Sequence, residues 1–452
     1  MTTLPSGKPL ISQSDCQTFC INNQFNSLFE MLLSAGSNAH GQLANGTLDD
    51  SYTFQKCKFE GRPDCPHARS TRVLDIASGA NHTVVLLHGE GPEVWGSGDG
   101  RKGQLGLNYQ REAKGGQKTA TFRRLNLSLS EFGLENHTFK SIAATWETTY
   151  IALSCEGKGD VLISMGSDDY GDLGIGNGRH MKDSPSDFHV VSFGHLSTPS
   201  GIQLLPGNIR IDAVYSGQRH IILSLGVSGS DGLVEPLLVG WGTSRHGQLG
   251  SSTSGKALPF TSEPTIIPIP PGADPIVSAS LGIHHTILSH RSGCVSALGA
   301  NRKHQLQLLQ EVKRAESIGC TWNGTYAVVQ DSERENSWTI ISSGSNSHSQ
   351  LGWDPESEGL VGAVRFTGSL DRKTVTKIAC GSEHVLLLLR DAFQQTGEVW
   401  GWGWNEHGNL GVGNTKDVPT PTCIWPPAAH TGAAVTGIWA GCGTSWINVE
   451  DD

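Results

Sequence analysis

The sequence predicts an all-β protein, a seven-bladed β-propeller, from three observations. Glycine contributes 57 of the 452 residues and charged residues only 17%, a balance that favours strands and turns over helices. A glycine-rich block and a second, apolar block each recur seven times, while the segments between them vary in length as surface loops do. Seven copies of a multi-stranded unit in about 420 residues fit a propeller with about four strands per blade.

The first block is a strand that runs into a glycine-rich turn. Its copies align without a gap: LLSAGSNAHGQLA (32–44), VWGSGDGRKGQLG (94–106), LISMGSDDYGDLG (162–174), LVGWGTSRHGQLG (238–250), VSALGANRKHQLQ (295–307), IISSGSNSHSQLG (340–352) and VWGWGWNEHGNLG (399–411). One column is always glycine: Gly36, Gly98, Gly166, Gly242, Gly299, Gly344 and Gly403. Another is always leucine: Leu43, Leu105, Leu173, Leu249, Leu306, Leu351 and Leu410. We assign both columns to the fold, the glycines to positive φ or close approach of blades and the leucines to the space between blades.

The second block is a turn of small residues that leads into an apolar, β-branched strand. Its copies begin at residues 76, 142, 214, 278, 318, 378 and 438. A histidine recurs in four of them (His82, His220, His285 and His384) and is expected to hydrogen-bond backbone near the interface between blades. A catalytic group is rarely needed several times around a ring, so we interpret these histidines as structural.

Together the two motifs resemble the regulator-of-chromosome-condensation repeat. The resemblance covers residues 31–449 and implies a seven-bladed β-propeller of that type. Residues 1–30 precede it and are expected to form an N-terminal extension that is either disordered or adds a closing strand to the last blade.

Two copies of the second block depart from the pattern and carry the first candidate site. They read Thr145-Trp146-Glu147 and Thr321-Trp322-Asn323. In the plant ultraviolet-sensing propellers that share this repeat, tryptophans at this place lie on one face and form an interface. The resemblance therefore implies that Trp146, Glu147 and Trp322 bind a partner, because tryptophan is favoured at binding hot spots. The alternative, that each tryptophan packs within its own turn, stays open.

The closing copy, GWGWNEHGNLG (401–411), carries the second candidate site. Trp400 and Trp402 have counterparts in other copies and are interpreted as structural, whereas Trp404 and Glu406 have none. The block resembles the last blade of the fungal alpha-tubulin suppressor propellers and their secretion-regulating animal counterparts. That resemblance implies a partner, the small zinc protein that donates electrons in diphthamide synthesis and works with Elongator on wobble uridines of tRNA.

The function expected from these features is that of a protein-binding propeller without catalytic chemistry of its own. No HExxH or GxSxG motif is present, and neither a cofactor nor a metal site is expected. One alternative is a guanine-nucleotide exchange factor for a small GTPase, with its wedge in the insertion DSPSDFHVVSFGHLSTPS (183–200). The other is a photoreceptor-like scaffold, which is disfavoured because only two blades carry the tryptophan and neither keeps the histidine.

Charge and composition narrow the range of partners and locations. The net charge is −10 and the sequence shows no cluster of Lys and Arg, so direct binding to nucleic acid or to an anionic membrane is not expected. A partner with a basic face would suit this charge. Without a secretory signal or an apolar run that could span a bilayer, the expected location is the cytoplasm, with the nucleus as a further option. Two cysteine spacings, Cys16 to Cys20 and Cys57 to Cys65-Pro-His67, are loosely metal-like but lack the paired CxxC form of zinc sites.

Overall fold

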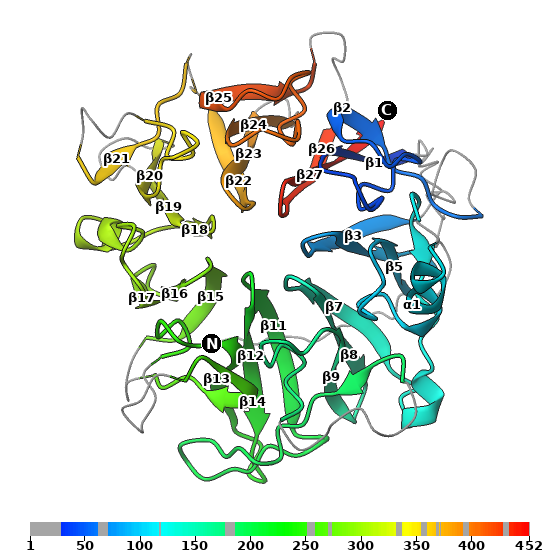
Figure 1. The fold of residues 1–452 in the computed structure, drawn as a ribbon. Coiled ribbons are helices and arrows are strands. Elements are labelled where there is room, and N and C mark those ends of the chain that lie inside the picture. The colour runs from blue at the N-terminus through cyan, green and yellow to red at the C-terminus, as the bar shows by residue number, and fades with distance from the viewer. Residues whose placement is uncertain are drawn as a thin grey trace, which may run out of the picture.

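The computed structural model describes residues 29–61, 71–116, 119–176, 186–250, 258–269, 274–330, 337–353, 359–367, 370, 372–391, 397–427 and 434–451. Its strands form seven separate antiparallel sheets arranged as blades around a common centre, which confirms the predicted seven-bladed β-propeller (Figure 1). No helix in these ranges has both the length and the apolar character needed to cross a bilayer.

Each blade begins with an inner strand beside the centre, and blades 1 to 6 continue outward in chain order. Blades 1 to 3 are β3 (Arg72–Ser78), β4 (His82–His88), β5 (Pro92–Gly98) and β6 (Arg123–Arg124); β7 (Thr138–Ala144), β8 (Thr148–Cys155), β9 (Gly159–Gly166) and β10 (His189–Val190); and β11 (Ile209–Ser216), β12 (His220–Ser228), β13 (Val234–Thr243) and β14 (Phe260–Ile266). Blades 4 to 6 are β15 (Ile276–Leu281), β16 (His285–His290) and β17 (Val295–Gly299); β18 (Ser317–Cys320), β19 (Gly324–Gln330), β20 (Trp338–Gly344) and β21 (Val361–Ala363); and β22 (Lys373–Cys380), β23 (His384–Asp391), β24 (Gly397–Gly403) and β25 (Val418–Trp425). A short helix, α1 (Leu107–Lys114), follows β5, and two 3-10 helices span Leu129–Phe132 and Gln307–Gln310.

Blade 7 joins strands from both ends of the described chain. From the centre outward it contains β26 (Ala434–Ala440), β27 (Thr444–Asp451), β1 (Phe29–Gly36) and β2 (Ser51–Lys56). Figure 1 shows the blue strands β1 and β2 beside the red strands β26 and β27. The closing strand β1 therefore begins at Phe29, within the last two residues of the predicted extension; residues 1–28 lie outside the described residues.

Two sequence blocks that are neighbours along the chain do not always belong to the same blade. The second block supplies the first two strands of a blade, and the glycine-rich block that comes after it supplies the third. A glycine-rich block and the second block that follows it therefore lie in adjacent blades. The first glycine-rich block, at β1, completes the last blade.

The hydrophobic core lies mainly between neighbouring blades. Leu105, for example, packs with Val84 and Leu86 of blade 1 and with Ile142 and Ile151 of blade 2. Of the repeated leucines, Leu306 is half-buried and the others are buried: Leu43, Leu105, Leu173, Leu249, Leu351 and Leu410. Apolar surface shared in this way holds each blade to the next.

The repeated glycine ends the third strand of each blade in a conformation that side chains rarely adopt. Its φ lies between +92° and +132° in all seven copies. At Gly403, a Cβ atom would lie 2.6 Å from the carbonyl oxygen of Glu383 in the adjacent turn. Only glycine avoids both the strain and the clash at this position.

Histidine side chains bridge four of the blade interfaces. The Nε2 atoms of His82, His220, His285 and His384 lie 3.0, 3.3, 3.1 and 3.1 Å from the hydroxyls of Thr149, Thr286, Thr325 and Ser445 on the following blade. The partner of Nε2 is thus a side-chain hydroxyl, and the expected hydrogen bonding with backbone is also present at His285, with Gly324, and at His384, with Thr444. The glycine three residues earlier makes room for the ring, since a Cβ on Gly79 would lie 2.2 Å from Cε1 of His82.

Candidate functional site

The two candidate tryptophan sites lie on one face of the propeller, which we call the turn face. In every blade this face carries the turn between the first and second strands and the glycine-rich turn after the third strand, because antiparallel neighbours reverse direction at each turn. The turns between first and second strands form an inner ring around the centre, and the glycine-rich turns lie further out.

Backbone hydrogen bonds between successive blades tie the inner ring together. Trp146 N–H donates to the carbonyl oxygen of Gln218 at 2.8 Å, and the Trp146 carbonyl accepts from Ala80 N–H at 2.9 Å. Trp322 is held in the same way, with its N–H donating to Ser382 at 2.7 Å and its carbonyl accepting from Ile283 at 2.9 Å. Both tryptophans therefore start from a backbone that is fixed on two sides.

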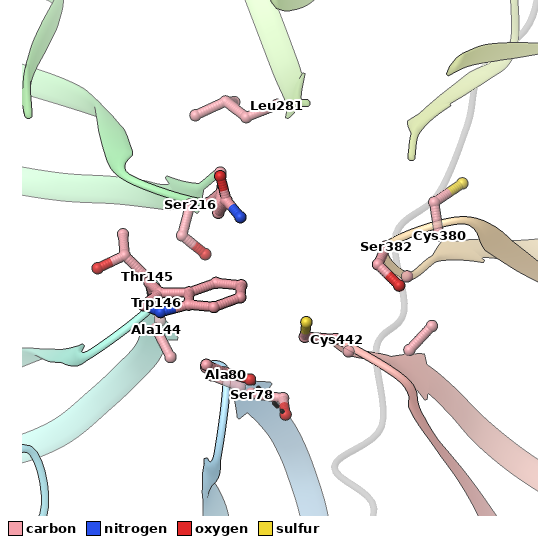
Figure 2. A pocket seen from close by; sticks show the side chains of 18 of the residues that line it. Ser78, Ala80, Ala144, Thr145, Trp146, Ser216, Leu281, Cys380, Ser382 and Cys442 are labelled. Atoms are coloured by element: carbon pink, nitrogen blue, oxygen red, sulfur yellow. Dashed lines mark hydrogen bonds between the residues drawn. The ribbon is translucent and has the colours of Figure 1, made fainter. Parts of the chain in front are cut away.

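The two tryptophan side chains meet over the centre of the ring. Their ring centroids lie 5.9 Å apart with an interplanar angle of 45°, and both side chains are half-buried. A cavity of about 270 Å³ lies at this point, lined by the inner strands and inner turns of all seven blades. Figure 2 shows the Trp146 side chain reaching into this cavity, with Cys380, Ser382 and Cys442 on other sides of it.

Three thiols line the cavity, and burial suppresses their reactivity. It raises the pKa of Cys320 and of Cys442 to about 12, and it raises the pKa of Cys380 as well. A thiol with a raised pKa stays protonated at neutral pH and is a poor nucleophile. The cavity walls are therefore better suited to packing than to covalent chemistry.

The blades that carry the tryptophans replace the glycine–histidine pair with another buried group. Thr145 and Thr321 stand where the other five blades all have glycine, and no histidine follows them. A buried tyrosine is present instead: Tyr150 O–H donates to the carbonyl of residue 172 at 2.5 Å, and Tyr326 O–H donates to the carbonyl of residue 350 at 2.7 Å. The change in motif therefore exchanges one internal hydrogen bond for another.

A tryptophan from the next blade completes this arrangement in both places. Trp241 Nε1 donates to the same carbonyl of Asp172 at 2.9 Å, and Trp402 Nε1 donates to the same carbonyl of Gln350 at 2.8 Å. Both indoles are fully buried. The blade pairs 2–3 and 5–6 thus share one internal design, with Trp146 and Trp322 projecting from its turn-face end.

The second candidate site lies over blade 6, outside the inner ring. Trp404 is half-buried, and its Nε1 donates to Oε2 of the exposed Glu406 at 3.2 Å. The Trp404 ring packs edge-on against His407 and His348, with centroids 5.4 and 6.1 Å away. Trp404 follows the end of β24 and belongs to the glycine-rich turn, unlike Trp400 and Trp402, which are buried on the strand.

Glu383 connects the two sites and was not singled out by the sequence. Its carbonyl oxygen accepts from Trp404 N–H at 2.9 Å, while Oε1 accepts from Asn323 Nδ2 at 3.0 Å, beside Trp322. Oε2 accepts from Gln350 at 2.7 Å, and burial raises the pKa of the carboxyl group. Glu383 thus links the two sites, with its backbone carbonyl on Trp404 and its half-buried carboxylate on Asn323, the residue after Trp322.

Blades 3 and 4 contribute positive charge to the same face. The Arg219 guanidinium lies over the rings of Trp146 and Tyr170, at 5.6 and 4.0 Å from their centroids. In the neighbouring blade, the His284 ring packs against His246 with a centroid separation of 4.1 Å and an interplanar angle of 44°. Cations over aromatic faces are attracted to them, so Arg219 helps to orient Trp146.

A signal in the sequence could have identified these neighbours. The residue after Trp146 in the second block is Glu147, and the same column holds Arg219, His284, Asn323 and Glu383 in other blades. A position whose residue type varies from blade to blade, while the rest of the repeat stays constant, is not needed for the fold and is a candidate for binding. Glu147 itself is half-buried, and its negative charge acts on Arg101 in the turn face of blade 1.

The insertion 183–200 was considered as an exchange-factor wedge. Its described part, residues 186–200, packs against the propeller. Phe188 is buried in the core shared by blades 1 and 2, and Phe193 and Leu196 are buried in the core shared by blades 2 and 3. Residues 183–185 of that insertion lie outside the described residues. Buried aromatic anchors hold the segment 186–200 to the blades, so this part does not form a projecting wedge.

The loosely metal-like spacings are only partly described. Cys57 is buried, and burial raises the pKa of its thiol to about 12. Cys16, Cys20, Cys65 and His67 lie outside the described residues. Among the side chains that the structure does describe, no group of three or more His, Cys, Asp or Glu could hold a metal ion.

Comparison with known proteins agrees with the repeat and with the fold. The family model described as "Regulator of chromosome condensation (RCC1) repeat" matches residues 396–446, which include the closing glycine-rich block. The structure of yeast RCC1 (Prp20), solved bound to Kap60, superimposes with a TM-score of 0.66 over 94% of this chain and 90% of that one, at 16% identity. The crystal structure of human WBSCR16 gives a TM-score of 0.65 over 92% of this chain and 99% of that chain, at 15% identity.

The chain is a seven-bladed β-propeller with an RCC1 repeat match in its closing blade. The secretion-regulating guanine nucleotide exchange factor of Mus musculus is 24% identical over 88% of this chain and 80% of its own length. An RCC1 repeat-containing protein of Schizosaccharomyces pombe is 26% identical over 93% of this chain and 99% of its own length. The ultraviolet-B receptor UVR8 of Arabidopsis thaliana is 28% identical over 78% of this chain and 70% of its own length. These relatives are thus named as an exchange factor, an RCC1 repeat-containing protein and a receptor.

Proposed function

We propose that this RCC1-type propeller is a protein-binding module that docks a partner on its turn face, at the centre of the ring. The observation that carries the proposal is the Trp146–Trp322 pair, two half-buried indoles 5.9 Å apart at the centre of the ring. Large aromatic side chains on a rigid backbone lose little entropy on binding and supply much contact area. The hydrogen bonds that fix both backbones favour such a preformed surface.

The test is affinity purification of the tagged full chain from cells, followed by mass spectrometry, with a Trp146→Ala/Trp322→Ala variant alongside. The expected result is a specific protein that the wild type recovers and the variant loses while remaining folded by circular dichroism. Equal recovery of every partner by the two proteins would remove the tryptophan pair from the binding surface. Trp338→Ala serves as a control, because Trp338 is half-buried at the opposite end of its strand β20.

For the partner itself we propose the small zinc protein that donates electrons in diphthamide synthesis and works with Elongator. The support is the resemblance of the block 401–411 to the fungal suppressor propellers, together with the pair of half-buried Trp404 and exposed Glu406 within that block. Purified partner should bind the wild type and bind a Trp404→Ala/Glu406→Ala variant more weakly. A deletion strain with intact diphthamide and normal wobble-uridine modification would argue against this partner.

The second candidate function is guanine-nucleotide exchange on a small GTPase. Its support is the similarity to the mouse protein named as a secretion-regulating exchange factor. The buried anchors Phe188 and Phe193 weaken the earlier choice of 183–200 as a wedge, so an exchange site would have to use another loop. Release of a fluorescent guanine nucleotide from purified GTPases, with and without the propeller, tests this function directly.

A further inference from the structure

Six cationic or titratable side chains from blades 3 and 4 gather on the turn face, and we call them the cationic cluster. They are Arg219, Arg245, His246, His284, Arg302 and Lys303. Arg219 and His284 come from the inner turns, and the other four come from the glycine-rich turns that follow β13 and β17. The sequence shows no run of basic residues here, because four separate turns supply the charges.

The pKa shifts of His246 and His284, whose rings are in contact, indicate the sign of the charge around them. The pKa of His246 is lowered by burial and then by the positive charges of Arg302 and Arg245. The pKa of His284 is lowered by burial, by His246 and by Arg302, against one backbone hydrogen bond that raises it. Every charged group that acts on this pair is therefore cationic, and both rings, 4.1 Å apart, lie in a positive field.

Little of this charge is neutralised within the protein. Arg245, Arg302 and Lys303 are exposed, and in the described part of the chain neither Arg245 nor Arg302 forms an ion pair. Arg219 and Lys303 each lie near acidic groups, since the charge of Arg219 acts on Asp172 and that of Lys303 acts on Glu383. Within the described part of a protein whose net charge is −10, the positive charges of Arg245 and Arg302 are thus not neutralised by an ion pair.

We propose that the cationic cluster binds an acidic segment of the partner protein, next to the tryptophan pair. The proposal rests on the proposed function and adds the chemistry of the partner. The cluster and the tryptophans form one surface, because Arg219 lies 5.6 Å from the Trp146 ring centroid. Arginine forks match carboxylates in paired hydrogen bonds, which lysine alone does not provide.

The surroundings of the cluster favour a short acidic peptide over a nucleic acid. Glu147 and Asp169 lie toward blade 2, and Glu383 lies toward blade 6. A long polyanion that crossed the turn face would meet these carboxylates, and their repulsion would offset the attraction of the cluster. A short peptide with a few carboxylates can bind entirely within the cationic cluster and avoid this repulsion.

The test measures direct binding of a defined probe to the full chain. A fluorescein-labelled peptide of alternating Glu and Gly is titrated with wild-type protein and followed by fluorescence anisotropy, beside a Lys–Gly peptide of equal length. The Arg245→Glu/Arg302→Glu variant should weaken binding of the acidic peptide by about tenfold or more, and added salt should weaken it for the wild type. The matched control is Arg291→Glu/Lys313→Glu, which reverses two exposed charges of blade 4 away from the cluster.

The outcomes separate this proposal from the proposed function. Equal binding of the acidic peptide by the wild type and the cluster variant, or no binding to the wild type, overturns the proposal. Tighter binding of a single-stranded oligonucleotide with the same number of charges overturns it in favour of nucleic acid. If the tryptophan variant loses a cellular partner that the cluster variant retains, the docking function stands and the acidic-segment proposal fails.

Discussion

Trp146 and Trp322 place their indole rings 5.9 Å apart although their turns belong to blades 2 and 5 of the ring. Neighbouring blades touch throughout the core, but these two blades are separated on both sides by others. A direct contact between them arises only because both side chains project over the central cavity. The pair therefore couples opposite parts of the propeller at the surface where we expect a partner.

The first prediction concerns that coupling. A double-mutant cycle with Trp146→Ala and Trp322→Ala should give an interaction free energy of roughly 0.5 to 1.5 kcal/mol, as aromatic pairs do. Urea unfolding of the four proteins supplies the measurement. Trp338→Ala combined with Trp146→Ala should be additive, and coupling of similar size in that control pair would mean that the effect is not a contact between rings.

The second prediction separates binding from folding at Trp404. Trp404→Ala with Glu406→Ala should weaken partner binding while the melting temperature stays nearly unchanged, because both side chains lie in a surface turn. Trp402→Ala is the contrast, since its fully buried ring should cost about 3 to 5 kcal/mol of stability. Thermal unfolding and binding are measured on the same preparations. A loss of stability at Trp404 comparable to that at Trp402 would return the pair to a structural role.

The third prediction is that glycine and histidine of the inner turn depend on each other. A Cβ on Gly79 would lie 2.2 Å from the His82 ring, so Gly79→Ala should destabilise the protein by about 1 to 3 kcal/mol. Adding His82→Ala removes the obstructing ring, so the double variant should lose less than the sum of the two single variants. Urea midpoints of the three variants test this, and strict additivity would contradict it.

The fourth prediction concerns Asp172, which occupies a column where most copies have glutamine. Burial raises the pKa of its carboxyl group from 3.8 to about 7, against the nearby charge of Arg219. The folded protein then holds a proton that the unfolded chain releases between pH 3.8 and 7, so this group makes stability fall as pH rises through that window. Asp172→Asn should remove the dependence and raise stability at pH 8 by up to about 4 kcal/mol.

Denaturant titrations at pH 5 and pH 8 measure the effect of Asp172→Asn. Asp169→Asn is the matched control, because Asp169 is exposed in the same turn and its pKa is lowered. The gain at pH 8 should exceed the gain at pH 5 for Asp172→Asn alone. An equal gain at both pH values would show that the carboxyl group does not titrate in this range.

The fifth prediction is steep loss of stability in acid. Burial lowers the pKa of His82, His285 and His384 from 6.5 to about 4 and that of His220 to about 3, so the folded protein keeps these rings neutral. The unfolded chain protonates them below pH 6.5, so their contribution is complete above that pH and is lost as pH falls toward 4. Each such histidine accounts for on the order of 3 kcal/mol, and thermal unfolding from pH 7 to pH 4 should fall more steeply than in a His384→Gln variant.

The repeat itself was readable from the sequence because geometry fixes it. Gly403 needs a positive φ and Leu410 fills space between blades, so each residue must return in every copy at the same spacing. Contacts between copies were less readable. Nothing in the chain order brings Arg245 to Arg302 or sets the reach of Trp146 across the cavity, since both depend on how blades are placed around the ring.

Two features of the turn face and its surroundings were not readable from the sequence, for identifiable physical reasons. The insertion 183–200 was considered as an exchange-factor wedge, but Phe188 and Phe193 bury it between blades where it is described. The net charge of −10 favoured a partner with a basic face, and this stays a prediction; the positive surface that four separate turns assemble was not visible, because no run of basic residues marks it. In this fold, turns from different repeats are close in space but far apart in the sequence, so a local sequence pattern does not show which of them lie together.

Blade 7 has a consequence for synthesis of the protein on the ribosome. Its inner strands β26 and β27 are among the last described residues to be translated, while β1 and β2 are among the first. Until β27 emerges, the nascent ring stays open and β1 presents unpaired edge groups to its surroundings. The whole interval between the emergence of β1 and that of β27 is thus open to misassociation of this edge, and a chaperone that covers β1 would act during it.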